Sequence, residues 1–176
     1  AERGGLPVVG AAFLLTQLGT HCAQAFAGRI GALDLTPPQT GLLRAIALAP
    51  GRSQQALADQ LGTPATRLVA LVDDLEQRGL VVRRRNPSDR RLYAVYLTGE
   101  GTALMDEIAR VAREHDDAVL AALDGEQRAV LRDLLRRVAD DQGLTPGVHP
   151  GYRTLRPADT AAPERPRRTP SADGAG

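Results

Sequence analysis

The sequence predicts a mainly α-helical fold with one small β-hairpin. Aromatic residues make up only 3% of the 176 residues and tryptophan is absent, so the core must come from leucine, valine and alanine, a composition that favours packed helices. Apolar residues recur at helical spacing through most of the chain. The segment Arg78–Arg91 has instead the pattern of strand, turn and strand. We expect one core with appendages.

The first predicted element is a long amphipathic helix. Apolar side chains recur at helical spacing from Val8 through Leu18 to Ile30, about six turns. Because this stripe continues past the point where a signal sequence would end, we expect a helix of the folded protein rather than a secretion signal. No apolar run approaches the roughly 18 residues of a membrane span, so we expect no membrane association.

Three shorter helices follow. Thr36-Pro37-Pro38 begins the first of them, with threonine as N-cap and proline in the first turn. Ser53 caps a helix over Gln54–Leu61 that Gly62 terminates. Another helix then begins after Gly62 and ends near Gly79. Two helices joined by a tight glycine turn predict a helix-turn-helix.

A β-hairpin is predicted next, and it concentrates the positive charge. Leu80–Arg85 and Leu92–Leu97 are short β-prone runs, the second with alternating side chains, and the residues between them favour a turn. Arg78–Arg91 holds six arginines and one carboxylate, whereas the rest of the chain is net negative. Such a basic segment directly after a helix-turn-helix indicates a surface for a polyanion.

The remaining chain predicts two helices and a tail. Thr98 is the N-cap of a long helix expected to run to about Leu123, and Asp124–Gln127 is a capping box that opens the last helix. Gly143 closes that helix, and the segment after it holds six of the twelve prolines. The apolar face of the last helix consists of Val130, Leu131, Leu134, Leu135 and Val138.

These residues resemble a MarR-type winged-helix transcriptional regulator over roughly residues 8–142. Leu61-Gly62, Leu75-Glu76 and Gly79-Leu80 stand at the family's usual places. The family's wing pattern, Asp-x-Arg followed by hydrophobic residues and Leu-Thr-x-x-Gly, is matched in order and spacing by Asp89, Arg91, Val95, Leu97, Thr98 and Gly101. The resemblance implies a cytoplasmic DNA-binding regulator, most often a repressor, that responds to a small lipophilic ligand.

The expected architecture is a winged helix-turn-helix with N- and C-terminal dimerisation helices. We expect an N-terminal dimerisation helix in residues 1–33, a DNA-binding domain in 34–98, C-terminal dimerisation helices in 99–142 and a disordered tail rich in proline and arginine in 143–176. The apolar faces at both chain ends exceed what the small central domain can cover. A homodimer would cover them and place two recognition helices one turn of DNA apart.

Candidate DNA-binding residues lie on the helix-turn-helix and the hairpin. The first two turns of the second helix would enter the major groove, the helix N-terminus after Ser53 would bind phosphate, and an arginine at the hairpin tip would fit the minor groove. The candidates are Ser53, Gln54, Thr63, Ala65, Thr66, Arg67, Ala70, Arg83, Arg84, Arg85, Asp89, Arg90 and Arg91.

Individual arginines in this set have different expected roles. Arg67 is the best candidate for guanine, with pairing to a nearby helix carboxylate, Asp74 or Glu76, as the alternative. Asp89 can orient Arg91 through a bidentate pair, with Arg90 as a substitute. On the first strand, we expect at least one arginine to face phosphate and another to be only solvated.

Other chemistry is weakly marked. Cys22 is the single cysteine, lies on the apolar stripe and therefore predicts a packed thiol in a reducing compartment rather than a peroxide sensor. His21 and His115 lack the spacing of a metal site, and no catalytic constellation is visible, so we expect no metal, no cofactor and no enzyme. Position suggests His21, Phe26 and Arg29 as effector-binding residues. The alternative function is a protein-assembly module whose wing arginines bind an acidic protein.

Overall fold

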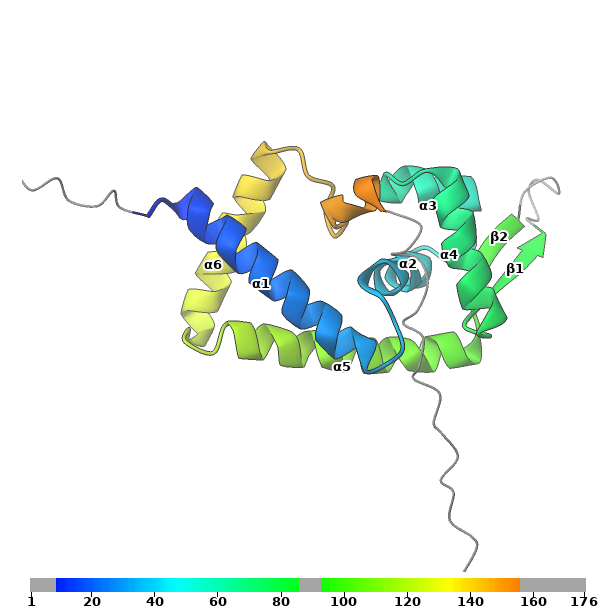
Figure 1. The fold of residues 1–176 in the computed structure, drawn as a ribbon, viewed down its shortest axis with the longest axis horizontal. Helices are drawn as coiled ribbons and strands as arrows, with labels where there is room; N and C mark the ends of the chain where they lie inside the picture. Colours follow the sequence, from blue (N-terminus) through cyan, green and yellow to red (C-terminus); the bar gives the residue numbers. More distant parts are fainter. Residues whose placement is uncertain (1–8, 86–92, 156–176) are drawn as a thin grey trace, which may run out of the picture.

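A computed structural model describes residues 9–85 and 93–155 (Figure 1). The fold is mainly helical with one two-stranded antiparallel sheet, as predicted. The elements are α1 (Ala11–Gly31), α2 (Pro37–Leu48), α3 (Gln54–Leu61), α4 (Ala65–Gln77), β1 (Val81–Arg85), β2 (Tyr93–Leu97), α5 (Gly99–Val119), α6 (Gly125–Asp141) and the 3-10 helix η1 (Pro150–Thr154).

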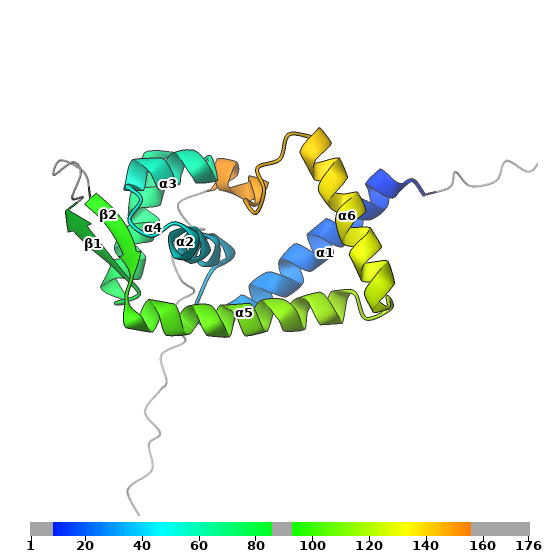
Figure 2. The same ribbon diagram turned by 180° about the vertical axis from the view of Figure 1, so that it is seen from behind.

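The core lies among α2, α3 and α4, which we call the reading head together with β1 and β2. Apolar side chains of these helices supply it, since Leu42, Leu57 and Leu71 are fully buried. Each buried leucine contributes about 1.5–3 kcal/mol relative to an exposed one. α5 runs along one side of the head, and α1 packs against α5 (Figures 1 and 2). None of the described helices is both long and apolar enough to cross a bilayer.

Local capping signals placed the helices of the head well. The Thr36 side chain accepts a hydrogen bond from the Gln39 N–H, and the Ser53 side chain accepts one from the Ala56 N–H. Gly62 follows α3 in the left-handed conformation, with φ +65°. A Cβ costs energy in that region, so glycine is a natural helix stop there. The predicted helix-turn-helix is confirmed, with α3 and α4 joined by the turn at Gly62.

The hairpin pairs Val81 with Leu97 at its base and Arg85 with Tyr93 at its outer end. The predicted turn, residues 86–92, lies outside the described residues. Ala94 and Val95 are neighbours on β2 and point to opposite faces of the strand, and both are buried, so the strand is covered on both faces there. The segment before α3 covers the second side of β2: the Val95 N–H donates to the Arg52 carbonyl, and the Val95 carbonyl accepts from the Gly51 N–H.

Two boundaries differ from the sequence expectation. α5 ends at Val119 rather than near Leu123, and residues 120–123 form the turn before Asp124, whose side chain caps α6 at the Gln127 N–H. The tail expected to be disordered from Gly143 is ordered as far as Leu155. Its proline content hid a 3-10 helix, and the side chains of Tyr152 and Leu155 are buried against the core.

Gly101 permits a close approach between α5 and Leu80, the residue before β1. A Cβ on Gly101 would lie 2.0 Å from the Leu80 carbonyl oxygen, whereas a Cβ on Gly99 would meet nothing within 4 Å. Because the obstacle is backbone, Gly101→Ala should lower the free energy of unfolding by about 2–3 kcal/mol. Gly99→Ala, the matched control in the same turn, should raise it by about 0.5 kcal/mol through helix propensity. Urea denaturation at fixed protein concentration measures both; equal effects would contradict the packing.

Candidate nucleic-acid interface

The outward face of α4 is the surface that a groove-binding helix would present. Ala65, Thr66 and Ala70 are exposed and Arg67 is half-buried, whereas the opposite face packs into the core. Thr63 departs from the expectation of an accessible contact residue: it is buried. The reason is its position in the turn between α3 and α4, where its N–H donates to the Ala58 carbonyl.

Arg67 has no ion-pair partner among the described residues. The two carboxylates that could have paired with it are engaged elsewhere. Asp74 lies 3.7 Å from the Arg78 guanidinium and accepts a hydrogen bond from the Gln39 side chain at 2.6 Å. Glu76 binds Arg83. The alternative expectation for Arg67, a pair with Asp74 or Glu76, is therefore not formed.

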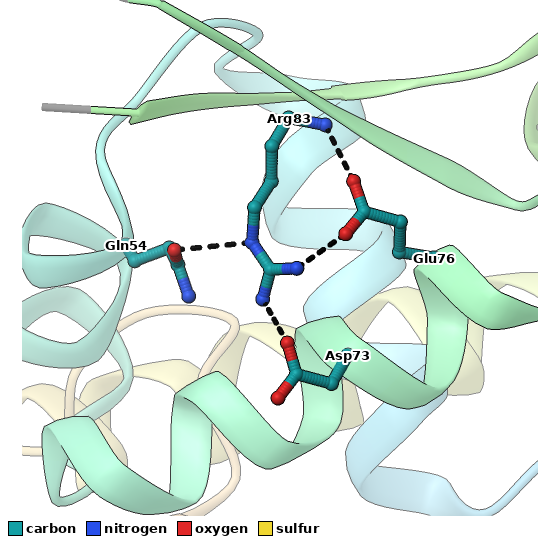
Figure 3. A network of polar contacts seen from close by, with 4 residues as sticks. All are labelled: Gln54, Asp73, Glu76 and Arg83. Atoms are coloured by element: carbon teal, nitrogen blue, oxygen red, sulfur yellow. Dashed lines mark hydrogen bonds and ion pairs between the residues drawn. The ribbon is translucent and has the colours of Figure 1, made fainter.

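Arg83 ties the wing to the helix-turn-helix (Figure 3). Its guanidinium forms ion pairs with Asp73 and Glu76 of α4. Its Nε donates to the Gln54 side-chain oxygen at 3.2 Å, and its backbone N–H donates to Glu76 at 3.0 Å. The Arg83 side chain is only 17% exposed. Arg83 is thus held inside the head by two carboxylates. The Gln54 side-chain oxygen is engaged in the same network, whereas its Nε2 has no hydrogen-bond partner among the described residues.

Arg84 and Arg85 remain exposed on β1. The Arg84 guanidinium lies over the Tyr96 ring, 5.5 Å from its centroid, a contact that orients the cation without neutralising it. Ser53, the N-cap of α3, is half-buried and its hydroxyl accepts the Ala56 N–H. Asp89, Arg90 and Arg91 lie outside the described residues. The described wing therefore offers two exposed arginines, and the third is engaged internally.

The three candidate effector residues gather near a fourth residue that the sequence did not mark for this role. Phe26 of α1 and His115 of α5 contact each other with ring centroids 5.5 Å apart. Burial lowers the pKa of His115, and the nearby charge of Arg29 lowers it further, with a smaller contribution from His21. His115 is 89 residues from Phe26, so only the packing of α1 on α5 could reveal the cluster.

Among the described residues, no group of three His, Cys, Asp or Glu side chains is placed to hold a metal ion. Cys22 is half-buried on α1 and makes no disulfide. The sequence also missed Asp73 and Glu76 as functional residues. Glu76 was expected only as a partner for Arg67, and no role was expected for Asp73.

Comparison with known proteins identifies close similarities. Residues 33–92 match the sequence profile of the MarR family. A putative transcriptional regulatory protein for the hcr operon of Thauera aromatica is 35% identical over 112 residues, covering 64% of this chain and 68% of that protein. The transcriptional regulator HosA of Escherichia coli O111:H- is 34% identical over 105 residues, covering 60% of this chain and 78% of that protein.

Solved structures agree with this match. The transcriptional repressor CouR, bound to a 23-mer DNA duplex, aligns with a TM-score of 0.67 and 31% identity, covering 79% of this chain and 98% of that chain. A DNA complex of a Mycobacterium tuberculosis MarR family protein aligns with a TM-score of 0.65 and 25% identity, covering 74% and 98%.

The Arg83 network should stabilise the head measurably. Arg83→Ala leaves Asp73 and Glu76 without their shared cation in a half-buried setting, so we expect a loss of about 1–3 kcal/mol in the free energy of unfolding, between the values for exposed and buried pairs. Arg85→Ala, the exposed neighbour on β1, should change it by less than about 0.5 kcal/mol. In a Glu76→Gln background the Arg83→Ala loss should shrink. Urea unfolding that shows the same loss for both arginines would contradict the network.

His115 predicts a pH dependence of stability. Its folded-state pKa lies below the usual value of about 6.5, so between these two pKa values the unfolded chain binds more protons than the folded one. The free energy of unfolding should therefore decline as pH falls through 6.5 towards the folded-state pKa. His115→Gln should remove this contribution. The measurement is urea unfolding between pH 8 and pH 5 on both proteins; parallel pH profiles would show that His115 is not responsible.

Proposed function

The chain belongs to the MarR family of winged-helix transcriptional regulators, and we propose that it is a cytoplasmic repressor that binds a pseudo-palindromic operator as a homodimer. The observation that carries this proposal is the pairing pattern of the arginines. Arg67 on α4 and Arg85 on β1 lie on the two elements that a winged helix brings to DNA, and neither has an ion-pair partner among the described residues. Guanidinium groups without an ion-pair partner suit phosphate and guanine contacts.

The homodimer is supported by apolar surface at the end of the molecule away from the hairpin. On α1, Phe13 is 61% exposed; on α6, Val130 and Leu134 are 54% and 50% exposed. Both views place α6 and the start of α1 opposite β1 and β2 (Figures 1 and 2). Clustered exposed leucine, valine and phenylalanine side chains mark protein contact surfaces. A second copy seated there would leave both reading heads free.

Ligand control is proposed at the α1–α5 contact. His21, Phe26 and Arg29 lie around His115, between a proposed dimerisation helix and the helix that follows the wing. An aromatic ring and a cation at one place suit a small aromatic ligand that carries negative charge. Such a ligand would act as a switch only if it bound two head spacings with different affinity.

An acidic protein partner is a weaker explanation of the exposed arginines. The relatives that align with a TM-score of 0.65 or 0.67 include two that are bound to DNA. Both explanations use the same exposed arginines, so the surface itself does not separate them. The DNA-bound structures of similar proteins favour duplex DNA.

The deciding experiment is selection from random duplex DNA at about 150 mM salt, where non-specific binding is weak. An inverted repeat with half-site centres about ten base pairs apart is the expected result. Retention of no motif would overturn the proposal and redirect the search to protein partners.

Substitutions of Arg67 and Arg85 should have different effects on binding to the selected operator. Arg67→Ala should cost about 1–3 kcal/mol and relax the preference at one base position of each half-site. Arg85→Ala should weaken binding to all sequences alike and reduce the salt slope by about one per contact. Arg136→Ala on α6 is the control and should change neither property. The assignment fails if Arg67→Ala leaves the base preference intact and Arg85→Ala leaves the salt slope intact.

A further inference from the structure

The chain returns to the reading head after α6. Leu144–Leu155, which we call the strap, runs from the end of α6 to the neighbourhood of α2 and α3, and η1 lies beside α3 in both views (Figures 1 and 2). Tyr152 and Leu155 are each 5% exposed and belong to the core cluster, with Val148 packed against it. The strap therefore packs on the head through apolar contacts as a built part of the fold.

Tyr152 is the anchor of this contact. Its hydroxyl donates a hydrogen bond to the Pro38 carbonyl in the first turn of α2. Its ring lies against Gly41: a Cβ there would be 2.2 Å from the Tyr152 hydroxyl oxygen and 3.0 Å from Cζ. Glycine is poorly suited to a helix interior, and Gly41 stands inside α2. The missing side chain is what makes room for the phenol ring.

A second contact holds the strap at Gly147, on the N-terminal side of Tyr152. Arg44, one turn after Gly41 on α2, donates from Nη1 to the Gly147 carbonyl at 2.9 Å. Gly147 has φ +71°, and a Cβ there would lie 2.8 Å from Arg44 Nη1. Gly41 thus permits the close approach of the ring, whereas Gly147 permits the left-handed backbone from which its carbonyl accepts the Arg44 hydrogen bond. This complementarity indicates a specific docking site.

Docking of the strap means that the chain segment made of α5, α6 and the strap both starts and ends at the reading head. The chain leaves the head through α5, turns into α6 and is returned to the head by the strap (Figure 2). We propose that the strap fixes the head relative to α6, and that Tyr152 is a positioning residue that sets which half-site spacing the dimer accepts. The second part rests on the proposed dimeric DNA binding. Restraining the heads before binding lowers the ordering cost at the matching spacing, whereas any other spacing requires the strap to yield.

Docking is tested without DNA by a double-mutant cycle read as thermal midpoints at fixed protein concentration. Gly41→Ala should lower the midpoint, because the new methyl group cannot coexist with the docked phenol. In a Tyr152→Ala background the same substitution should leave the midpoint unchanged or raise it, since alanine favours the helix. Tyr152→Phe keeps the ring and should lie between the wild-type protein and Tyr152→Ala. Additive losses from the two alanine substitutions would overturn the docking.

Positioning is tested on operators whose half-sites are moved apart or together by one base pair. Wild-type protein should bind the matching spacing far better than the altered ones, and Tyr152→Ala should reduce this ratio several-fold with an unchanged salt slope. A lowered midpoint with the wild-type spacing ratio would show that the strap only stabilises the fold, and would overturn the positioning role. If wild-type protein bound no duplex at all, the proposed function would fail, whereas the cycle would still decide the docking.

Discussion

The ion pairs of Arg83 with Asp73 and Glu76 are the constraint on which the arrangement of the head depends. A two-stranded hairpin is marginal by itself, and this one also depends on β2, where Val95 is buried in the core and hydrogen-bonded to Gly51 and Arg52 before α3. Arg83 adds a charged tie from the middle of β1 to α4, and Gln54 extends it to α3. Because the guanidinium is 17% exposed and both carboxylates are at least 37% exposed, the tie avoids the full desolvation cost of a buried pair. The angle between the wing and α4 is thereby set before any DNA is present.

This tie also divides the arginines by role. A count of positive charge treats every arginine of the hairpin as available to a polyanion, but Arg83 is neutralised by two carboxylates of the neighbouring helix. Arg84 lies over Tyr96, which leaves its charge in place, and Arg85 is exposed. The acidic residues of α4 therefore serve the interface by holding the wing, although they would repel phosphate if they were unpaired.

Local sequence signals predicted the helices of the reading head. Features that depend on contacts between residues far apart in the sequence were not predicted. Ser53 and Gly62 bracket α3 so closely that its bounds follow from the sequence, and Thr36 and Asp124 act through caps that span three residues. α5 was predicted too long because residues 120–123 contain no glycine or proline that would mark a helix end, although the helix ends at Val119. Thr63 is polar but is buried in the turn between α3 and α4. Only tertiary packing brings together three further pairs of residues: Arg83–Asp73, Phe26–His115 and Tyr152–Gly41. The strap was missed because proline and glycine content resembles that of a disordered tail, whereas two buried side chains suffice to order it.

The strap gives α6 a role that its sequence alone does not suggest. Within one chain, α6 has no buried residue, so its own packing does little to fix its direction. The capping box at Asp124 fixes its start after α5. The strap fixes its end on α2, where Gly147 accepts a hydrogen bond from Arg44 and Tyr152 donates one to Pro38. A helix held at both ends keeps its apolar face open and in a defined direction, which would reduce the entropy lost on forming the proposed dimer through that face. Through these two attachments, a change in dimer geometry would reach α2, which packs against α4. This route would bypass the α1–α5 contact, where a ligand is proposed to bind.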